Sequence, residues 1–276
     1  MKRTQWLPVA LVLSLASLSV ACSSADGDPE PGELNDDEIE AWNSAFEEME
    51  SGKADTAGCS GVIVPDRNGF NKRIALTFDD GPHPVLTPVI LDLLDQYRAK
   101  ATFLLIGKQA ETYPELVRLI AERGHEIGNH SYSHRNLTEM SGLEVERELV
   151  MTRQIVRRAC GEFITLFRPP GGHYNATVRA ATRTTGHSPV FWNENIGNYP
   201  GRPADEIVTS MLRKVGNSGI VLLHSGYDET PAVLPGLLRE FSARGYRMDT
   251  VSALCAHSPY VMAEAHAPGP PGWHLQ

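Results

Sequence analysis

The sequence predicts an α/β domain built on a parallel β-sheet, and two observations lead to this prediction. Short apolar segments, typical of strands buried on both faces, alternate with longer segments whose apolar residues recur every three or four positions. This alternation extends over most of the chain after residue 73. The domain is then either a barrel or an open sheet, and in both forms functional side chains collect at the carboxyl ends of the strands.

Each predicted element has its own residue signals. The predicted strands are the apolar segments 74–78, 101–106, 163–167, 189–192 and 219–223. The predicted helices are the segments 88–98, 114–123, 142–160, 175–185, 203–215 and 232–244, which carry apolar residues on one face. The second helix shows the boundary signals, because Pro114 suits a first helical turn and Gly124 follows the last turn.

The negative charge of the chain lies in one segment. The formal net charge of the 276 residues is −9, and residues 22–58 hold twelve acidic side chains against Lys53 alone. The chain from residue 59 onward is neutral overall, which argues against a nucleic-acid-binding protein because phosphate contacts require a basic surface. The composition, 41% hydrophobic and 21% charged, excludes a collagen and a multi-pass membrane protein.

Residues 1–21 have the pattern of an export signal. Lys2 and Arg3 precede an apolar segment that ends in small residues at Ala21. Cys22 follows directly, and the junction resembles the lipobox of bacterial lipoproteins, which implies cleavage before Cys22 and its lipidation. Ser19 departs from the usual leucine, so secretion after cleavage at Ala21 stays open as the alternative. In both cases the mature protein is expected to work outside the cytoplasm.

The segments that flank the predicted domain are polar. Residues 22–58 are expected to form an acidic tether, with a candidate helix at 36–51 whose apolar residues recur at helical spacing. Residues 257–276 are rich in proline and glycine, and we expect them to be disordered. The domain proper is therefore expected to occupy residues 59–256.

Three cysteines remain once Cys22 is set aside. They are Cys59, Cys160 and Cys255, and an exported protein can form disulfides. Because the number is odd, at most one internal bridge forms, and the sequence leaves its pairing open.

Polar residues follow several of the predicted strands. Asp79 and Asp80 end the first strand, where one carboxylate could bind a cation while the other acts as a base, or both could simply solvate a turn. His130 and His134 are spaced four apart, which on a helical turn places both rings on one face, as a divalent metal requires. Surface histidines are the ordinary alternative for this pair.

Two further strand ends carry candidate residues. Arg168 follows the third predicted strand and could orient a carboxylate through its planar guanidinium, or belong to a rigid Pro-Gly loop. The backbone N–H of Gly171 could approach a substrate oxygen. His224 ends the apolar strand 219–223, where a general acid would be well placed.

These motifs are much more specific together than singly. Thr77-Phe78-Asp79-Asp80-Gly81-Pro82, His130-x-x-x-His134, Arg168-Pro169-Pro170-Gly171 and Leu222-Leu223-His224 resemble, in this order, the polysaccharide deacetylases with the NodB homology domain, carbohydrate esterase family 4. The resemblance covers about residues 60–255. It implies a distorted (β/α) barrel with fewer than eight complete units, and metal-dependent removal of acetyl groups from N-acetylated polysaccharides.

The resemblance also implies a role for each carboxylate and histidine. Asp80, His130 and His134 would bind one divalent metal ion, zinc being the first candidate and cobalt, nickel or manganese the alternatives. Asp79 would take a proton from the attacking water, and His224 would protonate the leaving amine. This division agrees with the chemistry, because an amide needs polarisation on one side and proton donation on the other.

The remaining implied roles concern support and substrate. Arg168 would hold Asp79, and the backbone N–H of Gly171 would stabilise the oxyanion. The residues expected at the substrate are Tyr174, Trp192 and Leu222. The expected partner is an N-acetylated polysaccharide of the cell envelope, bound by a monomer whose only membrane contact is the lipid anchor.

One motif departs from the family pattern. The Asp-Trp pair that the family commonly has aligns with Asn198 and Tyr199. An amide supplies no charge, so we expect the pKa of His224 to be lower than in relatives with an aspartate. Two alternatives to the deacetylase stay open, a catalytically impaired protein that binds metal and glycan, and an esterase that acts on O-acetyl groups of a xylan-type substrate.

Overall fold

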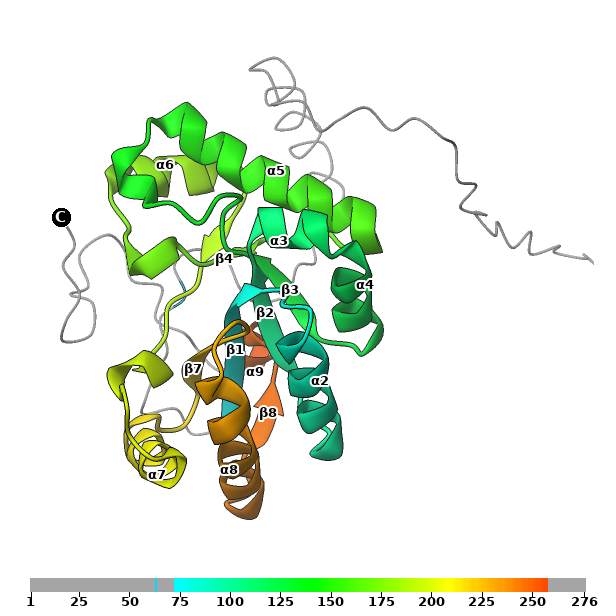
Figure 1. Cartoon of the computed structure of the whole chain (residues 1–276). Helices are drawn as coiled ribbons and strands as arrows, with labels where there is room; N and C mark the ends of the chain where they lie inside the picture. Colours follow the sequence, from blue (N-terminus) through cyan, green and yellow to red (C-terminus); the bar gives the residue numbers. More distant parts are fainter. Residues whose placement is uncertain (1–62, 64–71, 258–276) are drawn as a thin grey trace, which may run out of the picture. The chain divides into compact units, whose positions relative to one another are not determined.

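The computed structural model describes residue 63 and residues 72–257 of the chain. Within this part, eight parallel strands form one sheet in the order β5-β4-β3-β2-β1-β7-β6, and β8 pairs with β1 beside this path. The sheet curls into a half-barrel with helices packed around it (Figure 1). No helix lies between β5 and β6, so the prediction of a distorted barrel with fewer than eight complete units is confirmed.

The described residues form the following elements. The strands are β1 (Arg73–Gly81), β2 (Ala101–Leu105), β3 (Glu126–Asn129), β4 (Leu166–Phe167), β5 (Ser188–Pro189), β6 (Glu194–Asn195), β7 (Gly219–His224) and β8 (Arg247–Asp249). The helices are α2 (Leu86–Gln96), α3 (Gly107–Thr112), α4 (Pro114–Glu122), α5 (Gly142–Cys160), α6 (Ala176–Thr184), α7 (Ala204–Lys214), α8 (Glu229–Ala243) and α9 (Val251–His257). Short 3-10 turns occupy Leu137–Glu139, Pro170–Gly172 and Ile196–Asn198.

The long elements agree with the sequence expectation, and the short ones differ. Helix α5 has the predicted bounds, and its capping box is formed by Ser141 and Glu144. The predicted strand 163–167 shortens to β4, and the predicted strand 189–192 ends earlier, as β5. Strands β3, β6 and β8 and helices α3 and α9 were not predicted, because segments of two to seven residues are too short for a periodic pattern to stand out.

The two faces of the central strand β1 belong to different cores. Leu76 and Phe78 join a large cluster with apolar residues of α2, α4, α5, α7 and α8. Ala75 points to the opposite face and packs with Val251 of α9. Because side chains alternate along a strand, Asp79 lies on the same face as Ala75. We call this face of the sheet the inner face.

Most of the two terminal segments lies outside the described part of the chain. The predicted export signal, the acidic tether with its helix and the C-terminal tail lie outside the described residues, apart from His257 at the end of α9. Cys160 has a free thiol and Cys255 is disulfide-bonded, whereas Cys22 and Cys59 are not among the described residues. No described helix is long and apolar enough to cross a bilayer.

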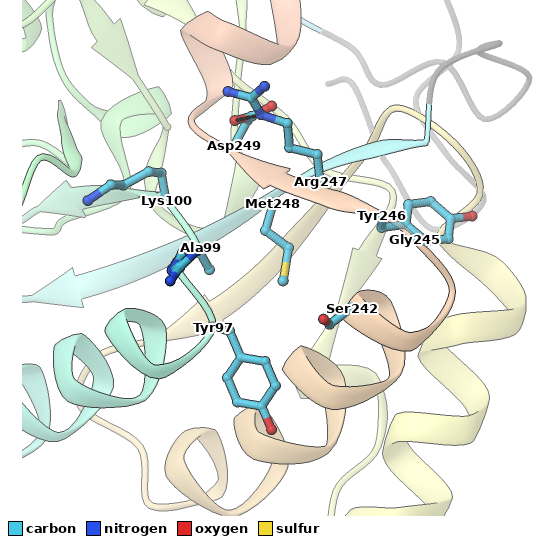
Figure 2. A pocket seen from close by; sticks show the side chains of 10 residues that line it. Tyr97, Ala99, Lys100, Ser242, Gly245, Tyr246, Arg247, Met248 and Asp249 are labelled. Carbon is cyan, nitrogen blue, oxygen red and sulfur yellow. Dashed lines mark hydrogen bonds and ion pairs between the residues drawn. The ribbon is translucent and has the colours of Figure 1, made fainter.

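A cavity of about 530 Å³ lies at the amino ends of β2 and β8. Figure 2 shows Tyr97, Ser242 and Met248 in its lining, which come from three separate segments. Three of the charged groups here are engaged, since Nε of Arg247 lies 2.9 Å from Oδ1 of Asp249 and Nζ of Lys100 donates to a backbone carbonyl. The predicted motif residues end the strands at the opposite, carboxyl edge of the sheet.

Candidate active site

The carboxyl end of β1 supplies two acidic side chains with different surroundings. Asp79 is 2% exposed and lies on the inner face of the sheet. Asp80 has a φ of 66°, in the left-handed region, and the pairing of β1 with β2 shifts register between Phe78 and Gly81. In a regular strand neighbouring side chains point to opposite faces, so this bulge is what brings both carboxylates to one site.

His130 and His134 lie in the loop that follows β3. The sequence suggested a helical turn for this pair, and that expectation is wrong, because Ser131 and His134 have left-handed φ values of 62° and 59° and the segment is not helical. The rings still meet, with centroids 4.9 Å apart. Nε2 of His134 lies 3.1 Å and Nε2 of His130 lies 3.4 Å from Oδ1 of Asp80.

The backbone orients the ring of His130. Its Nδ1 lies 2.8 Å from the carbonyl oxygen of Arg168, and a carbonyl can only accept, so Nδ1 carries the proton and donates it there. In the neutral ring Nε2 then presents a lone pair toward Asp80. A histidine held in this way, through its other nitrogen, is the usual arrangement of a metal ligand.

The atoms of this cluster fit a metal ion. One ligand atom each from Asp80, His130 and His134 lie within 4.8 Å of one another. Oδ1 of Asp80 is buried and has no well-formed hydrogen bond among the described residues. Two imidazole nitrogens and one carboxylate, with open positions beside them, are a donor set that suits zinc and other first-row divalent ions.

Charges inside the cluster determine the direction of its pKa shifts. Burial raises the pKa of Asp80, but the two histidines outweigh burial and hold this pKa well below its usual range. Burial lowers the pKa of His130, but the carboxylates of Asp79 and Asp80 outweigh it, so the pKa of His130 is raised. The cluster therefore favours positive charge next to Asp80, as a cation site does.

Arg168 holds Asp79 by a buried ion pair. Its guanidinium is 0% exposed, and Nη1 donates to Oδ1 of Asp79 at 2.7 Å and to the hydroxyl of Thr77 at 2.8 Å. Nε donates to the carbonyl of Val190, and the group lies 5.4 Å from the ring centroid of Trp192. Thr77 was not predicted as a site residue, although its place two residues before Asp79 puts it on the same strand face.

His224 lies beside Asp79 across the sheet. The parallel pairing of β1 with β7 places these two residues in register. Burial lowers the pKa of His224, and the carboxylates of Asp79 and Asp80 oppose this effect only in part. His130 and Arg168 lower the pKa of His224 further. The base, the cation cluster and the acid predicted from the sequence thus stand next to one another at one edge of the sheet.

The predicted substrate residues are distributed over this edge. Gly171 has a φ of 63°, and a Cβ on Gly172 would lie 3.0 Å from the ring of Trp192. Leu222 is 3% exposed on β7. Tyr174 is turned toward α6, where its hydroxyl lies 3.3 Å from that of Thr182.

Asn198 is an exposed residue of the turn after β6, and its side chain faces its own loop. Its amide donates to Oε1 of Glu194 at 3.3 Å, and the hydroxyl of Tyr199 donates to the same oxygen at 3.0 Å. After burial, the groups that act on the pKa of His224 are Asp79, Asp80, His130 and Arg168. The low pKa of His224 thus has a different physical cause from the one the sequence suggested. Glu194, 2% exposed, was not predicted as a structural residue of this loop.

The chain is similar to known proteins along most of the described part. A family model described as polysaccharide deacetylase matches residues 66–190. A peptidoglycan-N-acetylglucosamine deacetylase of Bacillus cereus is 37% identical over 200 residues, which is 71% of this chain and 93% of that protein. A chitooligosaccharide deacetylase of Azorhizobium caulinodans is 32% identical over 195 residues, covering 70% of this chain and 90% of that protein.

A solved structure agrees with these relatives. The structure of the peptidoglycan deacetylase PdaC from Bacillus subtilis superimposes with a TM-score of 0.63 at 33% identity, over 67% of this chain and 90% of that one. Fold, motif residues and relatives agree, and the chain belongs to the polysaccharide deacetylase family.

Proposed function

We propose that this polysaccharide deacetylase removes the acetyl group from N-acetylglucosamine units of peptidoglycan, with Asp79 as base and His224 as acid. The observation that supports these roles is the pairing of β1 with β7, in which Asp79 and His224 are register partners. The substrate is supported by the similarity to the B. cereus peptidoglycan deacetylase.

Asp80, His130 and His134 would hold the metal ion, for which we propose zinc. This ion would polarise the acetyl carbonyl and favour the ionisation of water. The protein supplies the rest of the chemistry. Arg168 donates to Oδ1 of Asp79 and holds the carboxylate in place, so Oδ2 is the oxygen that would accept the proton of the attacking water.

The second half of the reaction requires a proton on the leaving nitrogen. An amine leaves as a neutral molecule only if it is protonated as the carbon–nitrogen bond breaks, and His224 is the group in place to donate. Its low pKa makes the imidazolium a stronger acid, although a smaller fraction of the enzyme carries this proton at neutral pH. The backbone N–H of Gly171 would donate to the oxyanion.

The test is acetate release from purified glycans. We expect release from peptidoglycan that contains N-acetylglucosamine, loss of activity with a chelator and its recovery when zinc is added back. Acetate release from chitooligosaccharides but not from peptidoglycan would show that the proposed substrate is wrong and that the proposed deacetylation reaction is right. Release only from acetylated xylan would support the O-acetyl esterase, and glycan binding without any release would support the impaired protein.

We propose further that Cys22 is lipidated and anchors the enzyme to a bacterial membrane, which rests on the sequence of residues 1–22. From the composition of residues 23–35 we expect a flexible spacer, for which a root-mean-square length on the order of 20 Å would be enough to hold a small domain off the bilayer. Cys22→Ser should move the protein from the membrane fraction to the soluble fraction. Wild-type protein already found in the soluble fraction would favour secretion after Ala21.

A further inference from the structure

A half-exposed tyrosine stands next to the predicted acid. Tyr227 is 52% exposed and lies three residues after His224, in the loop between β7 and α8. Its ring centroid is 4.8 Å from that of His224, with the two rings at 70°, edge to face. Tyr227 belongs to no core cluster of the described residues, and its hydroxyl has no hydrogen bond within them. Such an aromatic ring leaves its apolar surface in water, which folding alone does not favour.

The loop that carries Tyr227 is firmly held. Thr230 is fully buried, its N–H donates to the carbonyl of Tyr227, and its hydroxyl donates to the carbonyl of His224 at 2.7 Å. The N–H of Ser225 donates to the carbonyl of Asp79 at 2.7 Å, and a Cβ on Gly81 would come within 2.9 Å of the Ser225 hydroxyl. The tyrosine is thus presented at a fixed place relative to the acid and the base.

We propose that Tyr227 binds the pyranose ring that carries the scissile acetamido group, and so contributes to the recognition of the sugar. This inference rests on the proposed function. The leaving nitrogen is bonded directly to the sugar ring, and His224 must approach this nitrogen to about 3 Å to donate its proton. The pyranose therefore lies within a few ångströms of His224, which is where the ring of Tyr227 stands.

The chemistry of a tyrosine fits this place. One face of a pyranose presents C–H groups, which pack on an aromatic ring, and the rim presents hydroxyls that a phenol can donate to or accept from. Because the loop is already ordered, binding loses little conformational entropy at this contact. Tyr227 is assigned to binding, not to proton transfer.

The test compares Tyr227→Ala and Tyr227→Phe with wild type, using a soluble tetramer of N-acetylglucosamine. Tyr227→Ala should raise KM about tenfold, the loss of one aromatic contact, with kcat changed less than about threefold. Tyr227→Phe should retain most of the affinity. Leu143→Ala is the matched control, since Leu143 has the same 52% exposure but lies on α5, which packs on α3, α4 and α6.

Several outcomes separate the alternatives. A fall in kcat with unchanged KM, or a shifted pH profile, would show that Tyr227 acts through His224 and would overturn the binding role. Wild-type KM in Tyr227→Ala would overturn it as well. Calorimetry with the tetramer measures affinity without turnover, so a tenfold weaker affinity in Tyr227→Ala supports the role even if acetate release fails. If wild type neither binds nor deacetylates the tetramer, the same comparison is made with peptidoglycan, where an unchanged KM in Tyr227→Ala overturns the binding role; wild type inactive on both glycans would instead contradict the proposed function.

Discussion

The two edges of the sheet each hold a buried carboxylate, but they use it differently. At the amino edge, Asp249 is 5% exposed and is paired with Arg73 and Arg247. At the carboxyl edge, the buried Asp79 is paired with Arg168, while the neighbouring Asp80 faces two histidines. The first arrangement balances its charges within the protein. The second leaves lone pairs directed at one another, which is stable only with a proton or a cation between them.

Backbone strain follows the same division. Five non-glycine residues of the described part have a positive φ; two of them, Asp80 and His134, belong to the cation cluster, and a third, Ser131, lies in the chain between its two histidines. A left-handed conformation at such residues costs on the order of 1 kcal/mol or more each. Favourable interactions elsewhere in the fold offset this strain. The left-handed residues direct the ligand atoms toward one another, whereas a regular strand or helix would direct them apart. The carboxyl edge is therefore distinguished less by its charge than by the ligand atoms of Asp80, His130 and His134, which point at one another.

The largest expected effect comes from removing a cluster ligand. His134→Ala should abolish stoichiometric zinc binding and lower acetate release by roughly a thousandfold or more, because polarisation by a metal supplies several kcal/mol to the transition state. The ring of His134 is 40% exposed, so the fold should tolerate the change. Metal content after dialysis and acetate release measure the two effects. Full activity at low free metal would refute the ligand assignment.

The second prediction separates the neighbouring carboxylates. Asp79→Asn should lower kcat by about 10²–10⁴, the usual contribution of a general base, while zinc remains bound. Calorimetric titration with zinc provides the measurement of affinity. The change also leaves the buried Arg168 charge unpaired, so assays should be run well below the melting temperature. If zinc is lost instead, Asp79 is a ligand and the two roles are shared.

The third prediction applies the same substitution at the amino edge. Asp249→Asn should lower the free energy of unfolding by about 2 kcal/mol, because it leaves Arg73 without its partner. It should change kcat/KM for deacetylation less than twofold, since Asp249 is in register with Ala75, four residues before Asp79 along β1. Urea denaturation and acetate release measure the two quantities. A large loss of activity at unchanged stability would contradict the assignment of Asp249 to stability and of Asp79 to catalysis.

The smallest expected effect concerns the pH profile. Because the pKa of His224 is lowered, mainly by burial, the protonated acid is lost as pH rises and the alkaline limb should fall below the ordinary histidine value of about 6.5. Asn198→Asp should leave this limb in place, since the side chain of Asn198 faces Glu194. The profile of kcat against pH for both proteins provides the comparison. An upward shift of about one unit would show that position 198 does reach His224.

Prediction from sequence was strongest where a pattern is local. Helix α5 was predicted to the residue, because nineteen residues carry several turns of apolar periodicity between a Ser-x-x-Glu cap and Gly161. The two-residue strands β4, β5 and β6 offered no such pattern. Strand β3 was missed because it contains Gly128 and Asn129, two residue types that are uncommon in strands. Glycine is required at position 128 because a Cβ there would come within 2.5 Å of the Leu104 side chain, and this contact exists only in the folded protein.

The sequence by itself determined the fold class, the motif residues at the strand ends and the chemistry that their side chains can perform. These depend on residue type and spacing, which are local properties. Only the tertiary structure decided how the motifs meet: the bulge that turns Asp80 toward the histidines, the register of His224 against Asp79, and the orientation of Asn198 toward Glu194. The first two relations join residues about 50 to 150 positions apart or depend on a single left-handed φ, and the third depends on how one short loop turns; none of these leaves a periodic signal in the chain.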